Sequence, residues 1–224
     1  MRRRVAAAAI VALTSWISVA FAARVAVEEW ASQPLGAHGI PAGWTKYATP
    51  GGRPAYDFTI VEDEGRRALR LVSHDEHSTI AKQIDVDLET TPILEWSWKV
   101  LGLPDGADIR SRATSDLTGH LFVVWPRFPE ALRSRLIGYA WGTSEPAGSV
   151  LRSRKSGTVT FVILRSGAEG LGRWLTERRD VAADYRKIYG ERPENPKAVA
   201  ISIDTNDTHS TAAALIGAIA FTSR

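Results

Sequence analysis

The sequence contains no cysteine among its 224 residues. Disulfide bonds, thiol catalysis, cysteine metal ligands and a lipid anchor on cysteine are therefore excluded. The sequence also lacks the Gly-x-Ser-x-Gly elbow of many hydrolases and a glycine-rich phosphate-binding loop. These absences argue against a serine hydrolase and against a nucleotide cofactor.

The chain has little excess charge once its first residues are set aside. It has 28 basic and 25 acidic residues, and three of the basic ones are Arg2, Arg3 and Arg4. Residues 23–224 therefore carry 25 basic and 25 acidic side chains and are formally neutral. A nucleic-acid or anionic-membrane partner receives no support from this charge balance.

Residues 1–22 have the pattern of a secretory signal peptide. The three arginines precede an apolar run over 5–19, and Ala20-Phe21-Ala22 supplies a small-x-small cleavage site. An uncleaved membrane anchor is the alternative, although the run is short for a span. We expect residues 1–22 to be removed, residues 23–224 to form a single domain without a membrane span, and the protein to be periplasmic or secreted.

The most regular pattern lies over residues 92–100. Leu94, Trp96, Trp98 and Val100 alternate there with polar residues. A period of two is typical of a strand that has one buried and one exposed face. We therefore expect the two indoles to lie side by side in the core.

Short apolar or alternating runs recur along the rest of the chain, separated by turn residues. Further strands are predicted at 44–47, 56–60, 69–71, 80–88, 121–125, 136–141, 158–164, 198–203 and 215–222. The last run has a helical alternative because alanines precede it. So many short strands predict an all-β protein, built as an antiparallel β-sandwich.

One stretch, 180–190, has a helical pattern. Val181, Tyr185 and Ile188 fall on one helical face, Asp180 is a suitable N-cap, and Gly190 is a natural stop. We therefore expect one short helix late in the chain.

Several motifs carry a resemblance to a known bacterial family. They are Tyr139-Ala140-Trp141-Gly142, Arg165-Ser166-Gly167, Trp174-x-x-Glu177-x-Arg179-x-Val181-x-x-Asp184-Tyr185 and Tyr189-Gly190. The chain resembles the family known as domain of unknown function 3047 from about Trp44 to its C-terminus. The resemblance implies an exported protein with a jelly-roll-like sandwich similar to galactose-binding and carbohydrate-binding modules, and it supplies no catalytic residues.

A group of oxygen donors follows the strand predicted at 198–203. Asp204, Asn206 and Asp207 offer the ligands that Ca²⁺ prefers, and an Asx turn is the alternative. The family pattern at 204–208 is Asp-x-Asp-Asn-Thr, and the family has an acidic residue where this chain has Ala218. If relatives bind a cation there, the site would be weaker in this chain. We expect no cofactor, with calcium at this turn as the one candidate. His74-Asp75-Glu76-His77 also offers metal ligands, but neighbouring side chains of an extended segment point in opposite directions.

Aromatic residues at the ends of two predicted strands are the first candidates for ligand contact. Trp125 and Trp141 end their strands, so we expect them at a rim, and Tyr139 alternates in phase with Trp141 and should share its face. Aromatic faces stack on the CH groups of sugar rings, so these residues predict a carbohydrate-binding surface. Core packing is the alternative for any of these side chains.

Charged residues form a second group of ligand-binding candidates. Asp116 and His120 adjoin a long polar loop over 103–117, and Arg179 and Asp184 belong to the helical block. Paired acids across a cleft would suit general acid–base chemistry on a glycan, provided that their spacing fits. For Arg179 and Asp184 the alternative is a structural ion pair.

Together these features predict an exported, non-catalytic module that binds carbohydrate or another cell-envelope ligand. One alternative is an enzyme that acts on polysaccharide through carboxylates of the 108–116 loop or through Asp184 and Asp204. The other alternative is a structural or assembly protein of the envelope.

Overall fold

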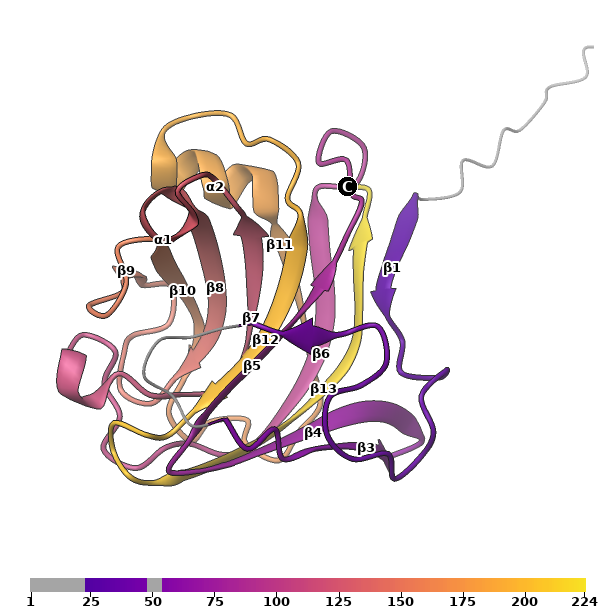
Figure 1. Cartoon of the computed structure of the whole chain (residues 1–224), viewed down its shortest axis with the longest axis vertical. Coiled ribbons are helices and arrows are strands. Elements are labelled where there is room, and N and C mark those ends of the chain that lie inside the picture. The colour runs from indigo at the N-terminus through magenta and orange to yellow at the C-terminus, as the bar shows by residue number, and fades with distance from the viewer. Residues whose placement is uncertain (1–22, 48–53) are drawn as a thin grey trace, which may run out of the picture.

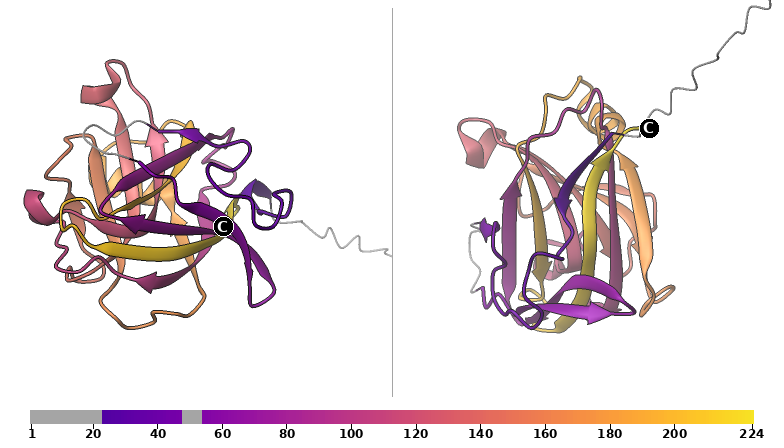
Figure 2. Two further views of the ribbon diagram at one scale, coloured as in Figure 1. Left: turned by 60° about the horizontal axis from the view of Figure 1, so that its bottom comes forward. Right: turned by 90° about the vertical axis from the view of Figure 1, so that its right-hand side faces the viewer.

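The computed structural model describes residues 23–47 and 54–224, and the expected leader, residues 1–22, lies outside them. The described chain forms two β-sheets that face each other as layers (Figures 1 and 2). The all-β sandwich predicted from the sequence is thereby confirmed. No helix within the described residues is both long and apolar enough to cross a membrane.

The first sheet has six strands within the described residues, in the order β11-β6-β13-β4-β3, with β1 also pairing with β13. These strands are β1 (Arg24–Glu28), β3 (Phe58–Asp63), β4 (Arg66–His74), β6 (Ile93–Gly102), β11 (Leu175–Asp180) and β13 (Thr211–Thr222).

The second sheet has seven described strands, in the order β2-β5-β12-β7-β8-β10-β9. These strands are β2 (Thr45–Lys46), β5 (His77–Gln83), β7 (Leu117–Trp125), β8 (Arg135–Gly142), β9 (Val150–Arg152), β10 (Val159–Ser166) and β12 (Ala198–Asp204). All the described pairings are antiparallel except that of β8 with β10, which is parallel.

The core between the sheets is rich in aromatic side chains. Trp96 and Trp98 are 1% and 0% exposed, which confirms the core position predicted for them. Their rings meet the seven-stranded sheet, with centroids 5.5 Å from that of Tyr139 and 5.9 Å from that of Trp141, respectively. The alternate side chains of β6 that include Trp96 and Trp98 therefore lie in the core, as the sequence pattern predicts.

A smaller apolar cluster covers the other, outer face of the seven-stranded sheet. Phe122 and Phe161 lie 5.8 Å apart in it, and Ala140 and Ala200 are buried there as well. Tyr47 packs against the same cluster. The strands of this sheet are thus apolar on both faces over part of their length, as in a central sheet.

Helix α2 (Val181–Tyr189) confirms the predicted helix and its two ends. The Asp180 carboxylate accepts a hydrogen bond from the Ala183 amide at 2.8 Å, and Gly190 closes the helix with φ 73°. The positive φ is available to glycine without a Cβ clash. Figure 1 places α2 at the upper end of the sandwich.

Some elements differ from the sequence predictions. The strand predicted over 80–88 is wrong beyond Gln83, because the Ile84 and Leu88 amides leave the ladder and donate to Lys197 and Asn195. The run 215–222 is strand within β13, so its helical alternative is wrong. Five elements were not predicted from the sequence: β1, β9, β11, the 3₁₀ turn η1 (Arg112–Thr114) and helix α1 (Glu130–Arg133).

Gly138 tests the packing of the outer face. A Cβ built there would lie 2.6 Å from a ring carbon of Phe161 and 2.7 Å from one of Phe122. We expect Gly138→Ala to lower the free energy of unfolding by about 1–3 kcal/mol in urea titrations, because overpacking outweighs the backbone gain from replacing glycine. Gly157→Ala, where no atom lies within 4 Å of the new Cβ, is the control. Equal stabilities of the two variants would contradict this packing.

Candidate functional site

A group of polar side chains lies on the outer face of the seven-stranded sheet, next to the phenylalanine cluster. We call it the polar cluster, and its members are His77, Thr79, Asp116, His120, Lys155, Ser202, Asp204 and Asp207. It unites two sets of residues that the sequence analysis had considered separately, Asp116 with His120 and Asp204 with Asp207.

Strand register brings the centre of the polar cluster together. His77 pairs with Asp204 across β5 and β12, and Ser202 pairs with Thr79 on one side and His120 on the other. Side chains directly opposite each other on neighbouring strands share a face. The Thr79 and Ser202 hydroxyls are 2.6 Å apart, and the His77 Nε2 atom lies 3.0 Å from the Thr79 hydroxyl.

His120 connects the polar cluster to the apolar one. Its Nδ1 atom donates to the Thr118 carbonyl at 2.8 Å, which leaves Nε2 as the acceptor nitrogen of the neutral ring. The imidazole meets the Phe122 ring edge-on at 4.9 Å and the Phe161 ring at 5.9 Å. Polar atoms and aromatic rings are therefore adjacent on one surface.

Three aspartates tie the loop before β7 to the loop after β12. Asp116 accepts hydrogen bonds from the amides of Asp207 and Thr208, at 3.1 and 2.7 Å. Asp207 accepts one from the Ser115 amide, and Asp204 accepts one from the Leu117 amide at 2.6 Å. These bonds hold the carboxyl groups of the two loops at one end of the sheet.

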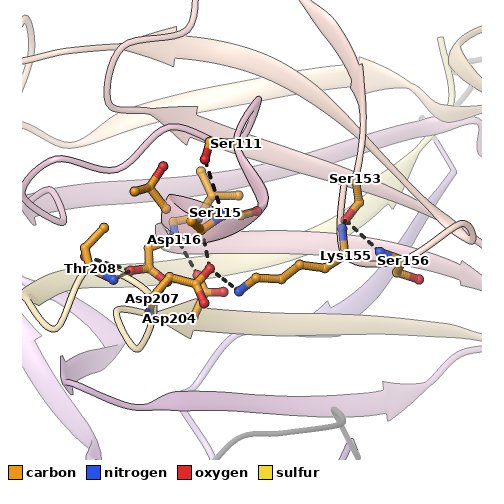
Figure 3. A network of polar contacts seen from close by, with 12 residues as sticks. Ser111, Ser115, Asp116, Ser153, Lys155, Ser156, Asp204, Asp207 and Thr208 are labelled. Atoms are coloured by element: carbon orange, nitrogen blue, oxygen red, sulfur yellow. Dashed lines mark hydrogen bonds and ion pairs between the residues drawn. The ribbon is translucent and has the colours of Figure 1, made fainter.

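Lys155 reaches the carboxyl group of Asp207 from a third segment of the chain. Figure 3 shows its side chain extended from the β9–β10 loop to the Asp207 carboxylate, with which it forms an ion pair. The Ser153 hydroxyl accepts hydrogen bonds from the Lys155 and Ser156 amides, at 3.1 Å each, and so shapes this loop. Four segments far apart in the sequence thus meet at the polar cluster.

Burial changes the protonation of the central residues. It raises the pKa of Asp204 to about 8, and the nearby Asp116 carboxylate adds to the rise. Burial and the nearby Lys155 ammonium together lower the pKa of His77 to about 4. Burial also lowers the pKa of His120 to about 4. Near neutral pH the polar cluster therefore presents a largely protonated carboxyl group and two neutral imidazoles.

The arrangement suits two kinds of chemistry. Neutral donors and acceptors beside aromatic rings complement a neutral molecule that carries several hydroxyl groups. A protonated carboxyl group near two carboxylates also has the protonation states that general acid–base catalysis requires. Both depend on the same residues, with Asp204 at the centre.

The structure does not arrange Asp204, Asn206 and Asp207 as a metal site. No group of three His, Asp or Glu residues placed to hold a metal ion occurs in the described part of the chain. The oxygens of Asp204 and Asp207 instead accept hydrogen bonds from the amides of Leu117 and Ser115, which belong to a different loop, so these bonds are not those of the Asx-turn alternative. The Lys155 ammonium forms an ion pair with Asp207. The segment 74–77 also disperses its side chains, because His74 is exposed while Glu76 is buried.

The prediction that Trp125 and Trp141 lie at a rim is wrong, and Tyr139, which shares the face of Trp141 as predicted, is buried with them. All three are at most 2% exposed and face the core between the sheets. The two indole N–H groups donate to the carbonyls of Glu194 and Gly167, respectively, at 2.8 and 2.9 Å, so their polar atoms are already paired. The reason is the orientation of β7 and β8, which turns these side chains inward and leaves small residues of β8 outside.

Arg179 and Asp184 form a separate unit with Tyr139. The guanidinium donates to both carboxylate oxygens of Asp184, at 3.0 and 2.5 Å, and the Tyr139 hydroxyl donates to the same carboxylate at 2.9 Å. This is the structural ion pair that was the alternative for these two residues. It fastens α2 to β11 and β8, and it contributes nothing to the polar cluster.

Thr79, Lys155 and Ser202 were missed by the sequence analysis. The alternation of β12 contains a signal for Ser202, a polar residue between Ile201 and Ile203. The signal for Thr79 is weaker, because it follows Ser78. Lys155 carries no such signal, because a loop contact depends on the path of the chain between strands.

Several solved structures are similar to this chain. The family 11 carbohydrate-binding module of the cellulosomal cellulase Lic26A-Cel5E of Clostridium thermocellum is 8% identical over 92% of this chain and 97% of its own, with a TM-score of 0.48. The xyloglucanase domain of NopAA, a type three effector from Sinorhizobium fredii, is 10% identical over 82% and 99%, with a TM-score of 0.40. The CBM22-1 xylan-binding domain from Paenibacillus barcinonensis Xyn10C is 10% identical over 92% and 99%, with a TM-score of 0.38. At this level of identity, a ligand named for one of these proteins does not transfer to the present chain.

No curated protein matches the chain. A family model does match it, over residues 42–220, and its description is "Protein of unknown function (DUF3047)".

The raised pKa of Asp204 predicts a pH-dependent stability difference. The folded state favours the protonated form of Asp204. The contribution of this group to the free energy of unfolding is therefore full below about pH 4 and is lost as the pH rises to about 8. We expect Asp204→Asn, which cannot ionise, to gain stability relative to the wild type across this range in urea unfolding. The histidine contributions are lost in the opposite direction, as the pH falls from about 6.5 to about 4, but they are common to both proteins and cancel in the difference. The exposed Asp105→Asn is the control, and parallel curves for Asp204→Asn and wild type would contradict the prediction.

Proposed function

This chain belongs to the family DUF3047, as its motifs predicted, and we propose that it is an exported, non-catalytic protein that binds carbohydrate at the polar cluster. The observation that carries the proposal is a set of buried polar side chains on the outer face of a sheet. Burial of polar groups is costly unless they are paired. On the same strands, the core-facing positions Ile80, Leu121 and Ile201 are apolar.

The protonation states favour a neutral ligand. A protonated Asp204 donates a hydrogen bond, and the neutral His120 accepts one at Nε2. The neutral His77 and the hydroxyls of Thr79 and Ser202 both donate and accept. Such a set pairs with sugar hydroxyls without leaving an uncompensated charge. The rings of the adjacent apolar cluster supply the surface that the CH groups of a sugar require.

A ligand would meet the polar cluster first at its exposed edge. His77 is partly exposed, and the Lys155 side chain is 33% exposed, whereas Ser202 and His120 are buried. The Lys155–Asp207 ion pair spans this edge between two loops. A sugar would therefore enter beside this ion pair.

Export places the ligand in the cell envelope or outside the cell. The proposal rests here on residues 1–22, whose pattern is that of a signal peptide and which lie outside the described residues. The absence of cysteine suits a protein that does not depend on a particular redox compartment.

Binding to a library of envelope glycans tests the proposal. We expect the purified protein to bind at least one glycan and His77→Gln to weaken that binding about tenfold, because the substitution removes a contact at the edge of the site. His74→Gln, an exposed histidine three residues away, is the matched control and should bind as the wild type does. Absence of binding to every glycan, or equal weakening by the two substitutions, would refute the proposal.

A second candidate function rests on the carboxyl groups of Asp116, Asp204 and Asp207, which hydrogen bonds hold at one end of the sheet. A carboxyl group with a pKa of about 8 beside Asp116 and Asp207 has the properties of the general acid in glycoside hydrolysis. If the protein is such an enzyme, release of reducing ends from a bound glycan should be abolished by Asp204→Asn while binding persists. A bound glycan that the wild type leaves intact would exclude this candidate and support the non-catalytic one.

A further inference from the structure

A separate pocket opens where the edges of the two sheets meet helix α2. Its volume is about 250 Å³, slightly below the range of about 300–1,000 Å³ that is usual for small-ligand pockets. Residues of β9, β10, β11 and α2 line it, and none of them belongs to the polar cluster. The lining residues used below are Val150, Leu164, Arg179, Asp184, Lys187 and Ile188.

The polar side of this pocket carries one more positive than negative charge. Asp184 is 8% exposed, and its charge is balanced by the two hydrogen bonds from Arg179. Lys187 is exposed on α2 and forms no ion pair with any described residue. The pocket therefore has a cation at its mouth that the protein itself does not neutralise.

The other side of the pocket is apolar. Val150 is 40% exposed although it is a large apolar residue, and Leu164 and Ile188 are partly buried beside the same space. An inorganic anion would leave these walls without a partner, and a sugar would find few polar groups along them. A ligand that fits both sides combines one negative charge with a short apolar body.

We propose that this pocket binds a small organic carboxylate. Its carboxylate pairs with Lys187 and faces the Arg179 guanidinium, and its hydrocarbon part lies against Val150, Leu164 and Ile188. The site is distinct from the polar cluster, so the proposal stands or falls independently of glycan binding.

Hexanoate is a suitable probe, with hexanamide as its uncharged counterpart. In nuclear magnetic resonance titrations of the isotope-labelled protein, we expect hexanoate to shift the backbone amides of Val150, Leu164 and Ile188 saturably. Hexanamide should bind about fivefold more weakly, because it lacks the charge that pairs with the lysine. Unshifted amides at these positions, or equal affinities for the two probes, would overturn the proposal.

Two neighbouring residues of α2 provide a matched pair of variants. Both side chains are exposed, so neither substitution should disturb folding, and thermal midpoints check this. Lys187→Gln should weaken hexanoate binding about fivefold and leave hexanamide binding unchanged. Arg186→Gln removes the same charge outside this pocket, and it should leave both affinities unchanged. Equal weakening by the two variants would show a general charge effect and refute the site.

Discussion

The contact between two pairs of aromatic rings determines how the rest of the molecule is arranged. Trp96 and Trp98 of one sheet pack against Tyr139 and Trp141 of the other, within 6 Å between centroids. Large aromatic groups contribute much of the buried apolar area of a core, so this contact fixes which face of each strand is turned inward. Side chains alternate between the two faces of a strand, so a shift of either strand by one residue would turn its rings out of the core.

The outer surface follows from the same contact. With Tyr139 and Trp141 inside, β8 turns Gly138 and Ala140 outward, and the lack of a side chain at Gly138 leaves room for Phe122 and Phe161. His120 then lies against these rings and carries the polar cluster to their edge. The candidate site is in this sense the reverse face of the tryptophan core.

Much of the fold was predictable because period and capping are local properties. The alternation around Trp96 and the cap at Asp180 both appear in a few consecutive residues, and both are confirmed. The site was predictable only in part. The alternation of β8 shows that Tyr139 and Trp141 share a face, but it does not show which face is covered. The approach of Lys155 to Asp207 depends on two loops 52 residues apart, which no local pattern relates.

The parallel pairing of β8 with β10 has a consequence for how such a surface changes over evolution. Two parallel neighbours cannot be joined by a tight turn, so the chain must travel back along the sheet between them. Residues 143–158 form this connection between β8 and β10, and Lys155 lies within it. Surface connections accept insertions and substitutions more readily than strands do. Selection can therefore alter what stands over the polar cluster by changing this connection, while the paired strands beneath it keep their register.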